Sequence, residues 1–560
     1  MSVPEPIALP NLLTPEKLAR ATPALDPKYL RNWFSSLPIT NTAATAQEVY
    51  RVLCNLNRLP MDARDRLELL ELSAPPVASV TAGLQLHLGQ VTLPLPPKKR
   101  QLADFLRQFQ AEMAYGYKSV IQDMHTASPA AWHKNRAAMA LAVERAIRHL
   151  GQILLRSYQV YVPYPAGIWR EIHGLYRYAE ENAGHGELVP LAPDGGAAKT
   201  TVAKSYLQTV LLGLCGPYQL PPNECGQVYA FLANWADKTI IARALDVTDT
   251  AGHFLIDLSA DLPPILFPRD VKPRAAAHLR DLMTLELARS VHTLIGRLQK
   301  GESPRVLNLG SECIDSACID MLQRILKFWG LSARRQFSRR AKRDAQLSVC
   351  AGLKALHFFS DGQRPFAPPE PAGLSLDAEP AIDMEGSRTR ALDFDSAISE
   401  GPEENFRIER WRTRDESAAG LSLLHLGEES VAVRVGDLLG LYNEGSGQWR
   451  VGLARWLKNP EMATLEMGVE MLAPSARPVA VKPATAVNKT KAVYSQALLL
   501  PAVEVLRQPP SLIVARGAYQ SGQDLWLADG QSGPRRVHPL TIIERSASFE
   551  QIAFAEVGAN

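Results

Sequence analysis

The hydrophobic pattern of the chain changes its period once, near residue 334, and this change limits the fold more than any other feature. Between residues 43 and 330, apolar side chains recur three and four residues apart, as at Leu102, Phe105 and Phe109. This spacing places them on one face of a helix. After residue 334, apolar and polar residues alternate in short runs, which is the period of a strand. The pattern predicts a helical region followed by a β region.

The chain is also too long for a single hydrophobic core. With 560 residues, it is several times longer than a typical domain, so we expect a multidomain α+β protein. We expect residues 1–42 to form an N-terminal segment and residues 43–330 to be mainly helical. Short apolar runs at residues 254–258 and 265–267 are typical of short strands or packed loops. The helical spacing is clearest at residues 169–180, 199–214, 224–235 and 274–299.

The β region begins with short runs of strand-forming residues, at residues 347–350 and 353–357. Residues 363–404 contain many prolines and acids and few periodic apolar residues, which predicts a flexible insertion. We assign residues 331–477 to one β unit that carries this insertion. A further β-like segment with glycine-containing turns follows, so residues 478–560 are expected to form a small β-rich C-terminal extension.

Composition and charge exclude several classes of protein. The apolar fraction of 46% is that of an ordinary globular protein. The longest apolar runs are much shorter than the roughly 20 residues that cross a bilayer, and the N-terminus lacks the pattern of a secretory signal. We therefore expect a cytoplasmic protein without a membrane span. The formal net charge of +3 is close to neutral and provides no overall attraction to nucleic acid.

The cysteines and histidines form no pattern that indicates a metal site or a catalytic centre. The six cysteines lie apart, without a Cys-x-x-Cys pair, and are expected to be reduced thiols. Cys313 and Cys318 are the nearest two, but they lack the second pair that a zinc site needs. No catalytic triad, metalloprotease or phosphate-loop pattern is present. We therefore expect a protein that is not an enzyme, with no metal and no cofactor.

The densest charge in the chain lies just before the β region. Residues 334–343, RRQFSRRAKR, contain five arginines and one lysine. A guanidinium group binds phosphate oxygens, or the O6/N7 edge of guanine, through two parallel hydrogen bonds, whereas lysine offers a point charge. The excess of arginine favours a shaped, nucleotide-like anion over a general acidic surface. A solvated basic linker is the alternative that the segment alone leaves open.

A second polar motif stands some 70 residues later, between two strand-like runs. Asp415, Ser417 and Gly420 form an Asp-x-Ser-x-x-Gly pattern, which predicts a turn between two strands. A carboxylate can accept from the paired N–H groups of guanine, and a serine hydroxyl can contact a phosphate. Glycine permits a positive φ or a close approach that a Cβ would prevent. Taken alone, such a turn is more often structural than ligand-binding.

Taken together and in this order, the two motifs resemble the signature of PilZ domains. That signature is an Arg-x-x-x-Arg on a loop before a barrel, followed by Asp/Asn-x-Ser-x-x-Gly at a neighbouring strand end. The likeness continues in strand-like runs at residues 435–442, 449–456 and 467–472, and covers residues 334–477 in all. It implies a six-stranded antiparallel β-barrel that binds cyclic di-GMP, often as an intercalated dimer.

The resemblance also implies roles for particular residues. Arg335 and Arg339, preceded by Arg334, match the arginine pair that holds phosphates and guanines. Arg339 and Arg343 have the same spacing, so both pairs stay open. We prefer the first pair because of its distance from the first strand of the barrel. The second motif is supplied without a departure by Asp415, Ser417 and Gly420.

The function implied by the resemblance is that of a bacterial cyclic di-GMP receptor that signals through residues 43–330 to a protein partner. In this hypothesis the dinucleotide bridges the arginine-rich segment to the barrel and reorients the helical region. One alternative is a non-catalytic scaffold whose barrel binds no ligand. Another is a nucleic-acid-binding protein that uses the arginine-rich segment, with Trp449 and Trp456 stacked on bases. The near-neutral charge argues against nucleic acid, and the apolar surroundings of both tryptophans favour places in a core.

Overall fold

The structure is a computed structural model in which two compact units can be recognised. The first, named here the helical unit, consists of Met1–Gln336, Gly427–Ser430 and Trp456–Glu466. The second, the barrel unit, consists of Phe337–Leu426, Val431–Arg455 and Met467–Asn560. The residues described are 27–557, except positions 36, 38–41, 89–90, 129–130, 194–195, 244–249, 269–276, 310–314, 331–339, 370–405, 418, 446, 485–492, 504–507, 520–521 and 531–532.

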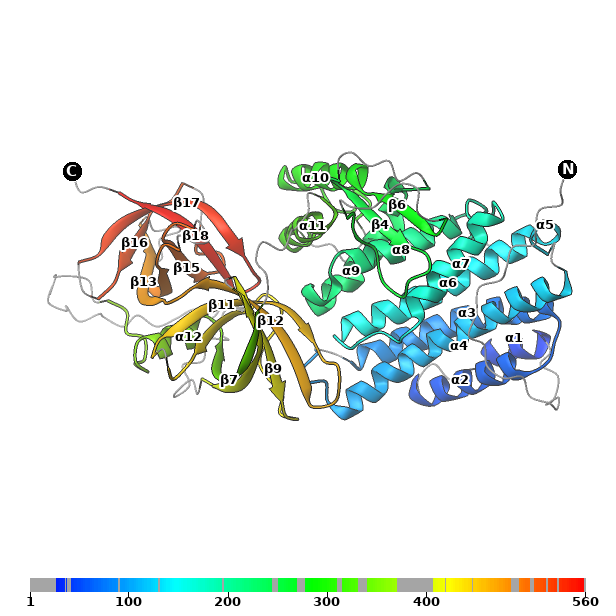
Figure 1. Cartoon of the computed structure of the whole chain (residues 1–560), viewed down its shortest axis with the longest axis horizontal. Coiled ribbons are helices and arrows are strands. Elements are labelled where there is room, and N and C mark those ends of the chain that lie inside the picture. The colour runs from blue at the N-terminus through cyan, green and yellow to red at the C-terminus, as the bar shows by residue number, and fades with distance from the viewer. Residues whose placement is uncertain are drawn as a thin grey trace, which may run out of the picture. The chain divides into compact units, whose positions relative to one another are not determined.

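Long amphipathic helices make up most of the helical unit (Figure 1). Helix α4 packs against α3 and α6, while α8 packs against α6 and α9. The expected helices at 169–180 and 224–235 are confirmed as α7 and α9. The helices are α1 (Pro27–Ser35), α2 (Thr42–Arg58), α3 (Ala63–Leu86), α4 (Pro97–Ala127), α5 (Ala131–Lys134), α6 (Arg136–Gln159), α7 (Ile168–Glu181), α8 (Val202–Leu214), α9 (Pro222–Trp235), α10 (Leu285–Gln299) and α11 (Asp315–Trp329).

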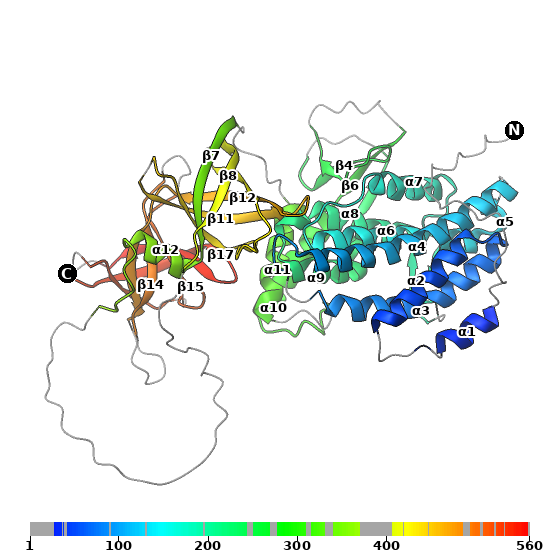
Figure 2. The same cartoon turned by 90° about the horizontal axis from the view of Figure 1, so that it is seen from below.

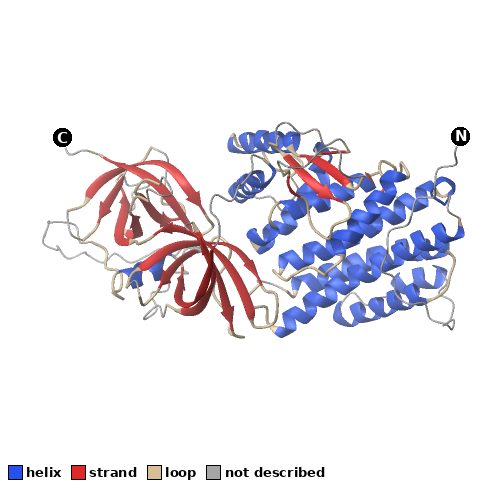
Figure 3. Ribbon diagram, viewed as in Figure 1, coloured by secondary structure: helices blue, strands red, loops and turns tan. Residues whose placement is uncertain are grey.

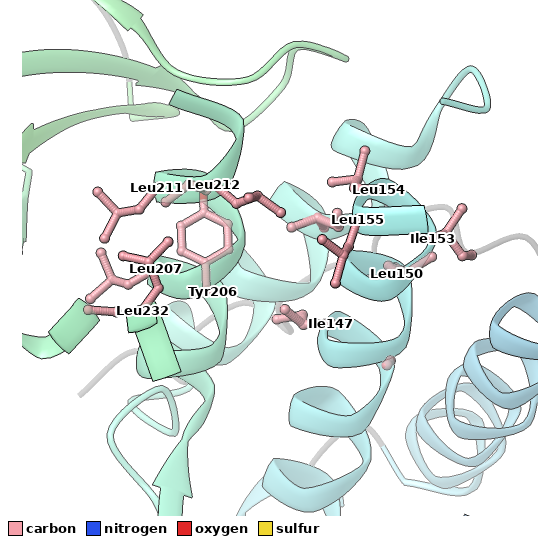
Figure 4. Packing of buried hydrophobic residues seen from close by; sticks show 14 of the residues in the cluster. Ile147, Leu150, Ile153, Leu154, Leu155, Tyr206, Leu207, Leu211, Leu212 and Leu232 are labelled. Atoms are coloured by element: carbon pink, nitrogen blue, oxygen red, sulfur yellow. The ribbon is translucent and has the colours of Figure 1, made fainter. Parts of the chain in front are cut away.

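The apolar stripes of these helices form one continuous core. Figure 4 shows Leu150 and Leu154 on α6, Tyr206 and Leu211 on α8, and Leu232 on α9, all members of one buried cluster. Each of them is less than a twentieth exposed. Burying a side chain of this size stabilises the fold by about 1.5–3 kcal/mol, so the helical unit is held together mainly by the faces that the sequence pattern marks.

A four-stranded sheet lies within the helical unit, next to α7 and α8 (Figure 2). The strands expected at 254–258 and 265–267 are confirmed as β4 and β5. A two-stranded ribbon, β1 (Leu188–Pro190) with β2 (Lys199–Thr201), accompanies it. The order in the larger sheet is β3 (Ile240–Ala242), β6 (Leu279–Met283), β4 (His253–Asp257) and β5 (Ile265–Leu266).

The expectation of a helix over 274–299 is wrong in its first part. Residues Leu279–Met283 form the strand β6, and helix α10 begins only at Leu285. The reason lies in two buried charges on the strand. Arg280 is ion-paired with Glu180 at 2.5 Å, and the Asp281 carboxylate lies 2.9 Å from His253 Nδ1. Charged residues in the middle of a strand interrupt its apolar pattern, so the sequence alone favoured a helix.

The barrel unit contains two closed six-stranded antiparallel barrels and little helix (Figure 3). The first barrel has the strand order β10-β11-β12-β9-β8-β7. An α+β architecture and a six-stranded barrel after the helical region are therefore both present. Its strands are β7 (Arg340–Ala351), β8 (Glu409–Ser417), β9 (Gly420–Leu426), β10 (Leu438–Tyr442), β11 (Trp449–Lys458) and β12 (Thr464–Ala473).

The expected β-rich C-terminal extension is present, and its strands close into a second barrel. The C-terminal segment is itself a closed barrel with the order β13-β14-β15-β18-β17-β16. It closes where β13 pairs with β16, as at Val481 and Leu527. Its strands are β13 (Arg477–Pro483), β14 (Ser495–Leu500), β15 (Ser511–Ala515), β16 (Leu525–Ala528), β17 (Arg535–Arg545) and β18 (Phe549–Glu556).

Three further expectations have different outcomes. Residues 353–357, expected to be a strand, begin the helix α12 (Leu353–Ser360), which follows Gly352 at a positive φ of 97°. A left-handed glycine ends β7 there and lets the chain turn into the helix. Of the predicted insertion at 363–404, residues 370–404 lie outside the described residues. Cys318 is disulfide-bonded, so the expectation of reduced thiols is wrong for that residue.

The tip of the β11–β12 hairpin, Trp456–Glu466, belongs to the helical unit. Within this unit Asn459 is fully buried. Its Oδ1 accepts a hydrogen bond from Leu95 N at 2.9 Å, and its backbone N donates to Tyr161 O at 2.7 Å. Its carbonyl accepts from the guanidinium of Arg100 at 3.0 Å. The hairpin tip is thus fixed at two places, the start of α4 and the turn after α6, through one side chain and its backbone.

Candidate functional site

The Asp-x-Ser-x-x-Gly motif forms the turn between β8 and β9. Asp415 and Ser417 lie at the end of β8, and Gly420 is the first residue of β9. The Ser417 hydroxyl donates to Gly420 O at 3.2 Å, across the directly paired ends of the two strands. Asp415 pairs with Ser422 on the neighbouring strand. Both motif side chains are half-buried, and the hydroxyl is held in place by its bond to Gly420 O.

The sequence left two reasons for a glycine at position 420, a positive φ or a close approach of another group. The structure shows the close approach. Gly420 does not have a positive φ. A Cβ at this position would lie 2.5 Å from Val469 O of β12. A neighbouring hydrogen bond supports the same conclusion, because Met471 N of β12 donates to Ala419 O of the turn at 2.9 Å. The turn is therefore pressed against β12, and the close approach is to backbone of the same barrel.

The arginine-rich segment can be followed only where it enters the barrel. Arg334, Arg335 and Arg339 lie outside the described residues. Arg343 lies on β7, and its side chain is also outside the description. The backbone of β7 begins directly after Arg339, and its first two residues pair with Glu416 and Asp415 respectively. The pairing is irregular as far as Ala345. The chain thus brings the start of β7 and the Asp415 motif side by side.

Two charged residues that sequence reasoning missed lie at the same end of the barrel. Arg450 of β11 is ion-paired with Glu416 of β8 at 3.5 Å. Burial lowers the pKa of the Arg450 guanidinium. Among the described residues, none accepts a hydrogen bond from its Nε. The signal in the sequence that could have identified Arg450 was its position within the apolar run of β11. Burying a charge is costly unless it is paired, so an arginine at such a place indicates a charged partner nearby.

This arrangement is suited to binding rather than to bond making. It offers a carboxylate, a hydroxyl and a half-buried guanidinium at one barrel end, next to the point where the arginine-rich segment enters. In the part of the chain that is described, no three His, Cys, Asp or Glu side chains come close enough to hold a metal ion. Likewise, no described helix is long and apolar enough to cross a membrane.

Two histidines of the helical unit, His173 and His253, have structural roles. His173 is buried; its Nδ1 lies 2.7 Å from the Tyr206 hydroxyl and its Nε2 lies 2.9 Å from Leu262 O. Burial lowers the pKa of His173 to about 4, so it is neutral at physiological pH. His253 Nδ1 lies 2.9 Å from the Asp281 carboxylate in the small sheet. Neither contacts a serine or cysteine nucleophile through these bonds.

Three family models match the chain in consecutive order. A model described as "Cyclic-di-GMP receptor FimW, N-terminal domain" matches residues 28–244. The model "Cyclic-di-GMP receptor FimW, middle PilZ domain" matches residues 253–369 and 372–478. The model "FimW C-terminal beta-barrel domain" matches residues 479–557. The middle match contains the Asp415 turn and the first barrel, and the last match covers the second barrel.

A similar protein is known from Pseudomonas aeruginosa. The chain is 28% identical over 536 residues to a protein named "Cyclic-di-GMP receptor FimW", and the alignment covers 89% of this chain and 85% of that protein. No solved structure matches the chain.

Proposed function

The chain belongs to the family of PilZ-domain cyclic-di-GMP receptors whose three domain models it matches in order, and we propose that its first barrel binds cyclic di-GMP. The observation that carries this proposal is the strand register. It brings the entry of the arginine-rich segment and the Asp415 motif together at one barrel end. The start of β7, which follows Arg339 directly in the sequence, thus lies beside the Asp415 motif, and this supports a nucleotide site to which both motifs contribute.

Each proposed ligand contact follows from the chemistry of its side chain. Arg335 and Arg339, preceded by Arg334, would hold phosphates or a guanine edge through paired hydrogen bonds. The pair Arg339 and Arg343 stays an alternative. Asp415 would accept from the N–H groups of a guanine, and the Ser417 hydroxyl would contact a phosphate. Gly420 would act indirectly, by allowing the turn to lie against β12.

We further propose that ligand binding is signalled through residues 43–330 to a protein partner. The β11–β12 hairpin supports this idea, since its two ends have different surroundings. Near its base, Val469 and Met471 contact the motif turn. At its tip, buried Asn459 is hydrogen-bonded to helical segments. A shift of the turn on ligand binding would move β12 and with it the tip. The cytoplasmic location expected from the sequence stays a prediction.

The binding proposal is tested by calorimetric titration of the full chain with cyclic di-GMP. Arg339→Ala and Asp415→Ala should each weaken binding by about 2–5 kcal/mol, because removing one partner of a desolvated charged contact leaves the other unpaired. Arg364→Ala is a matched control, since this exposed arginine of the barrel unit is paired with Asp361 at 2.8 Å. Comparing Arg335→Ala with Arg343→Ala decides which arginine pair binds.

Two results would contradict the binding proposal. Absence of binding by the unmodified chain would favour a scaffold role. Tight binding of a short single-stranded oligonucleotide, lost in Arg339→Ala, would favour a nucleic-acid-binding role instead.

The signalling proposal is tested by hydrogen exchange with and without cyclic di-GMP. Binding should change the protection of the Leu95 amide, which is bonded to Asn459. Asn459→Ala should keep the affinity for the ligand and abolish this change. Asn443→Ala is the control, because this asparagine makes a local bond with Gly445 N in the turn after β10. An unchanged response in Asn459→Ala would exclude the hairpin as the route.

A further inference from the structure

A cleft of about 1160 Å³ lies within the barrel unit, between the two barrels. The first barrel contributes Ser348, Tyr442 and Trp449, and the second contributes Leu499 and Arg535. Known ligand pockets measure roughly 300–1,000 Å³, so the space is large enough for a nucleotide-sized molecule. None of the residues of the Asp415 motif lines it. The cleft is therefore separate from the proposed cyclic di-GMP site.

The walls of this cleft are held by a core that the two barrels share. Leu438 and Leu453 of the first barrel belong to the same buried cluster as Leu498 and Ile513 of the second. Helix α12 packs against both barrels. An ion pair also joins them, between Arg455 Nη2 and a Glu544 carboxylate oxygen at 2.7 Å. A shared core and a charged contact fix the two walls, so the cleft exists before a ligand arrives.

One wall of the cleft is aromatic. Phe359 stacks on Trp449 with their ring centroids 5.2 Å apart, and Tyr442 lies 5.2 Å from Trp449 on the adjacent strand. All three line the cleft. Trp449 and Tyr442 are half-buried, so part of each ring faces the open space. A row of rings provides a surface on which a planar group such as a nucleobase can stack.

The opposite wall carries an excess of positive charge. The charged residues that line the cleft are Arg477, Arg535 and Glu556. Arg535 Nη1 is paired with Glu556 at 3.2 Å. In the described part of the chain, no acceptor lies within hydrogen-bond reach of Arg535 Nε, although this atom is buried. No described carboxylate pairs with Arg477 either. Two guanidinium groups against one carboxylate favour an anionic ligand group.

From these two walls we propose that the cleft is a second ligand site, which binds a planar aromatic anion of nucleotide size. The ring of the ligand stacks on the wall formed by Tyr442 and Trp449. Its anionic group accepts hydrogen bonds from Arg535 Nε and from Arg477. The site requires neither cyclic di-GMP nor the Asp415 motif.

The test uses the full chain saturated with cyclic di-GMP, so that the first site is occupied, and titrates it with guanosine monophosphate. The nucleotide should bind, while guanosine, which lacks the phosphate, should bind about tenfold more weakly or worse. Arg535→Gln should weaken binding of the nucleotide by about tenfold, because it removes a charge-assisted hydrogen bond. Tyr442→Leu should weaken the nucleotide and the nucleoside alike, by about tenfold, since it removes a stacking surface.

The chain offers a closely matched control. Arg536 is the next residue on β17 and is also ion-paired, with Asp524 at 2.6 Å, but it does not line the cleft. Arg536→Gln should leave binding of guanosine monophosphate unchanged. Equal affinities of Arg535→Gln and the unmodified chain would overturn the proposal. So would the absence of binding, equal binding of guanosine, or loss of binding in Asp415→Ala measured without cyclic di-GMP.

Discussion

The two barrels of this protein share a plan and differ in what their strands carry. Both are closed, antiparallel and six-stranded. The interior of the second barrel is formed by aliphatic side chains such as Val481, Leu512 and Leu527. Ion pairs occur in both, as between Arg450 and Glu416 in the first barrel and between Arg535 and Glu556 in the second, but the polar turn of the Asp415 motif belongs to the first. Closure of a sheet satisfies its edges in both cases, so the proposed binding rests on the polar turn of the first barrel and not on barrel closure, which both barrels share.

The largest expected effects come from the two cores, and they separate stability from binding. Leu512 of the second barrel and Leu423 of the first are both fully buried. Leu512→Ala and Leu423→Ala should each cost about 2–5 kcal/mol of unfolding free energy. Only Leu423→Ala should also weaken cyclic di-GMP binding, since Leu423 lies on β9 close to the motif turn.

Urea unfolding, monitored through hydrogen exchange, measures the change in unfolding free energy. Calorimetric titration of the folded fraction measures the change in affinity for cyclic di-GMP. Equal affinities of the two variants for cyclic di-GMP would contradict the view that the first barrel alone carries the site.

A smaller effect is expected from one glycine in each barrel. Gly420→Ala should destabilise the first barrel by about 1–3 kcal/mol, as overpacking does, because the new Cβ would lie 2.5 Å from Val469 O. Gly533 precedes β17 of the second barrel and has open space around its Cβ position. Gly533→Ala should therefore change stability by less than about 0.5 kcal/mol. Thermal unfolding compares the two variants, and a harmless Gly420→Ala would show that the turn can move away from β12.

The same comparison explains which parts of the fold could be predicted from the sequence. The motif turn is local, since Asp415, Ser417 and Gly420 lie within six residues, and its pattern identified the first barrel. Closure of the second barrel depends on the pairing of Val481 with Leu527, which are far apart in the sequence. No local pattern indicates such a pairing, so the sequence predicted strands there but not a barrel.

For the proposed binding site, the sequence indicates the motif residues but not the residues that support them. Val469 contacts the turn through its backbone carbonyl, and backbone contacts leave no trace in residue type. The Arg450–Glu416 pair is formed by residues of different strands. The buried strand β6 was missed for a related reason, because Arg280 is tolerated there only through its partner Glu180. A single sequence does not reveal which residues from distant segments contact one another in the fold.

Two aspartates provide the finest test of the comparison, because their pKa values shift in opposite directions. Asp437, in the first barrel, is half-buried and accepts from Arg434 N at 2.7 Å. Burial raises its pKa to about 6, above its ordinary value of 3.8, although this hydrogen bond opposes the shift. The folded state therefore binds the proton more tightly than the unfolded state. The stability that this group contributes is complete below about pH 4 and is lost as the pH rises through 6.

Asp437→Asn should remove this loss of stability at higher pH. The amide oxygen can still accept the hydrogen bond from Arg434 N. The variant should be more stable than the unmodified chain at pH 7, by an amount on the order of 1 kcal/mol once solvent screening is allowed for, and equally stable at pH 4. Urea unfolding at several pH values, followed through the exchange of β10 amides, measures this difference. A constant difference between pH 4 and 7 would show that packing, and not titration, is responsible.

Asp524 of the second barrel should behave in the opposite way. A hydrogen bond with His538 at 2.6 Å, together with the nearby Arg536 guanidinium, holds the pKa of this carboxyl below its ordinary value. Its contribution to stability is therefore present above about pH 3.8 and is lost as the pH falls through the lowered pKa. Asp524→Asn should weaken the second barrel slightly at pH 7, and added salt should reduce the effect because the group is near the surface. If Asp524→Asn and Asp437→Asn changed stability with the same sign at pH 7, the two barrels would not differ electrostatically in the way that their structures indicate.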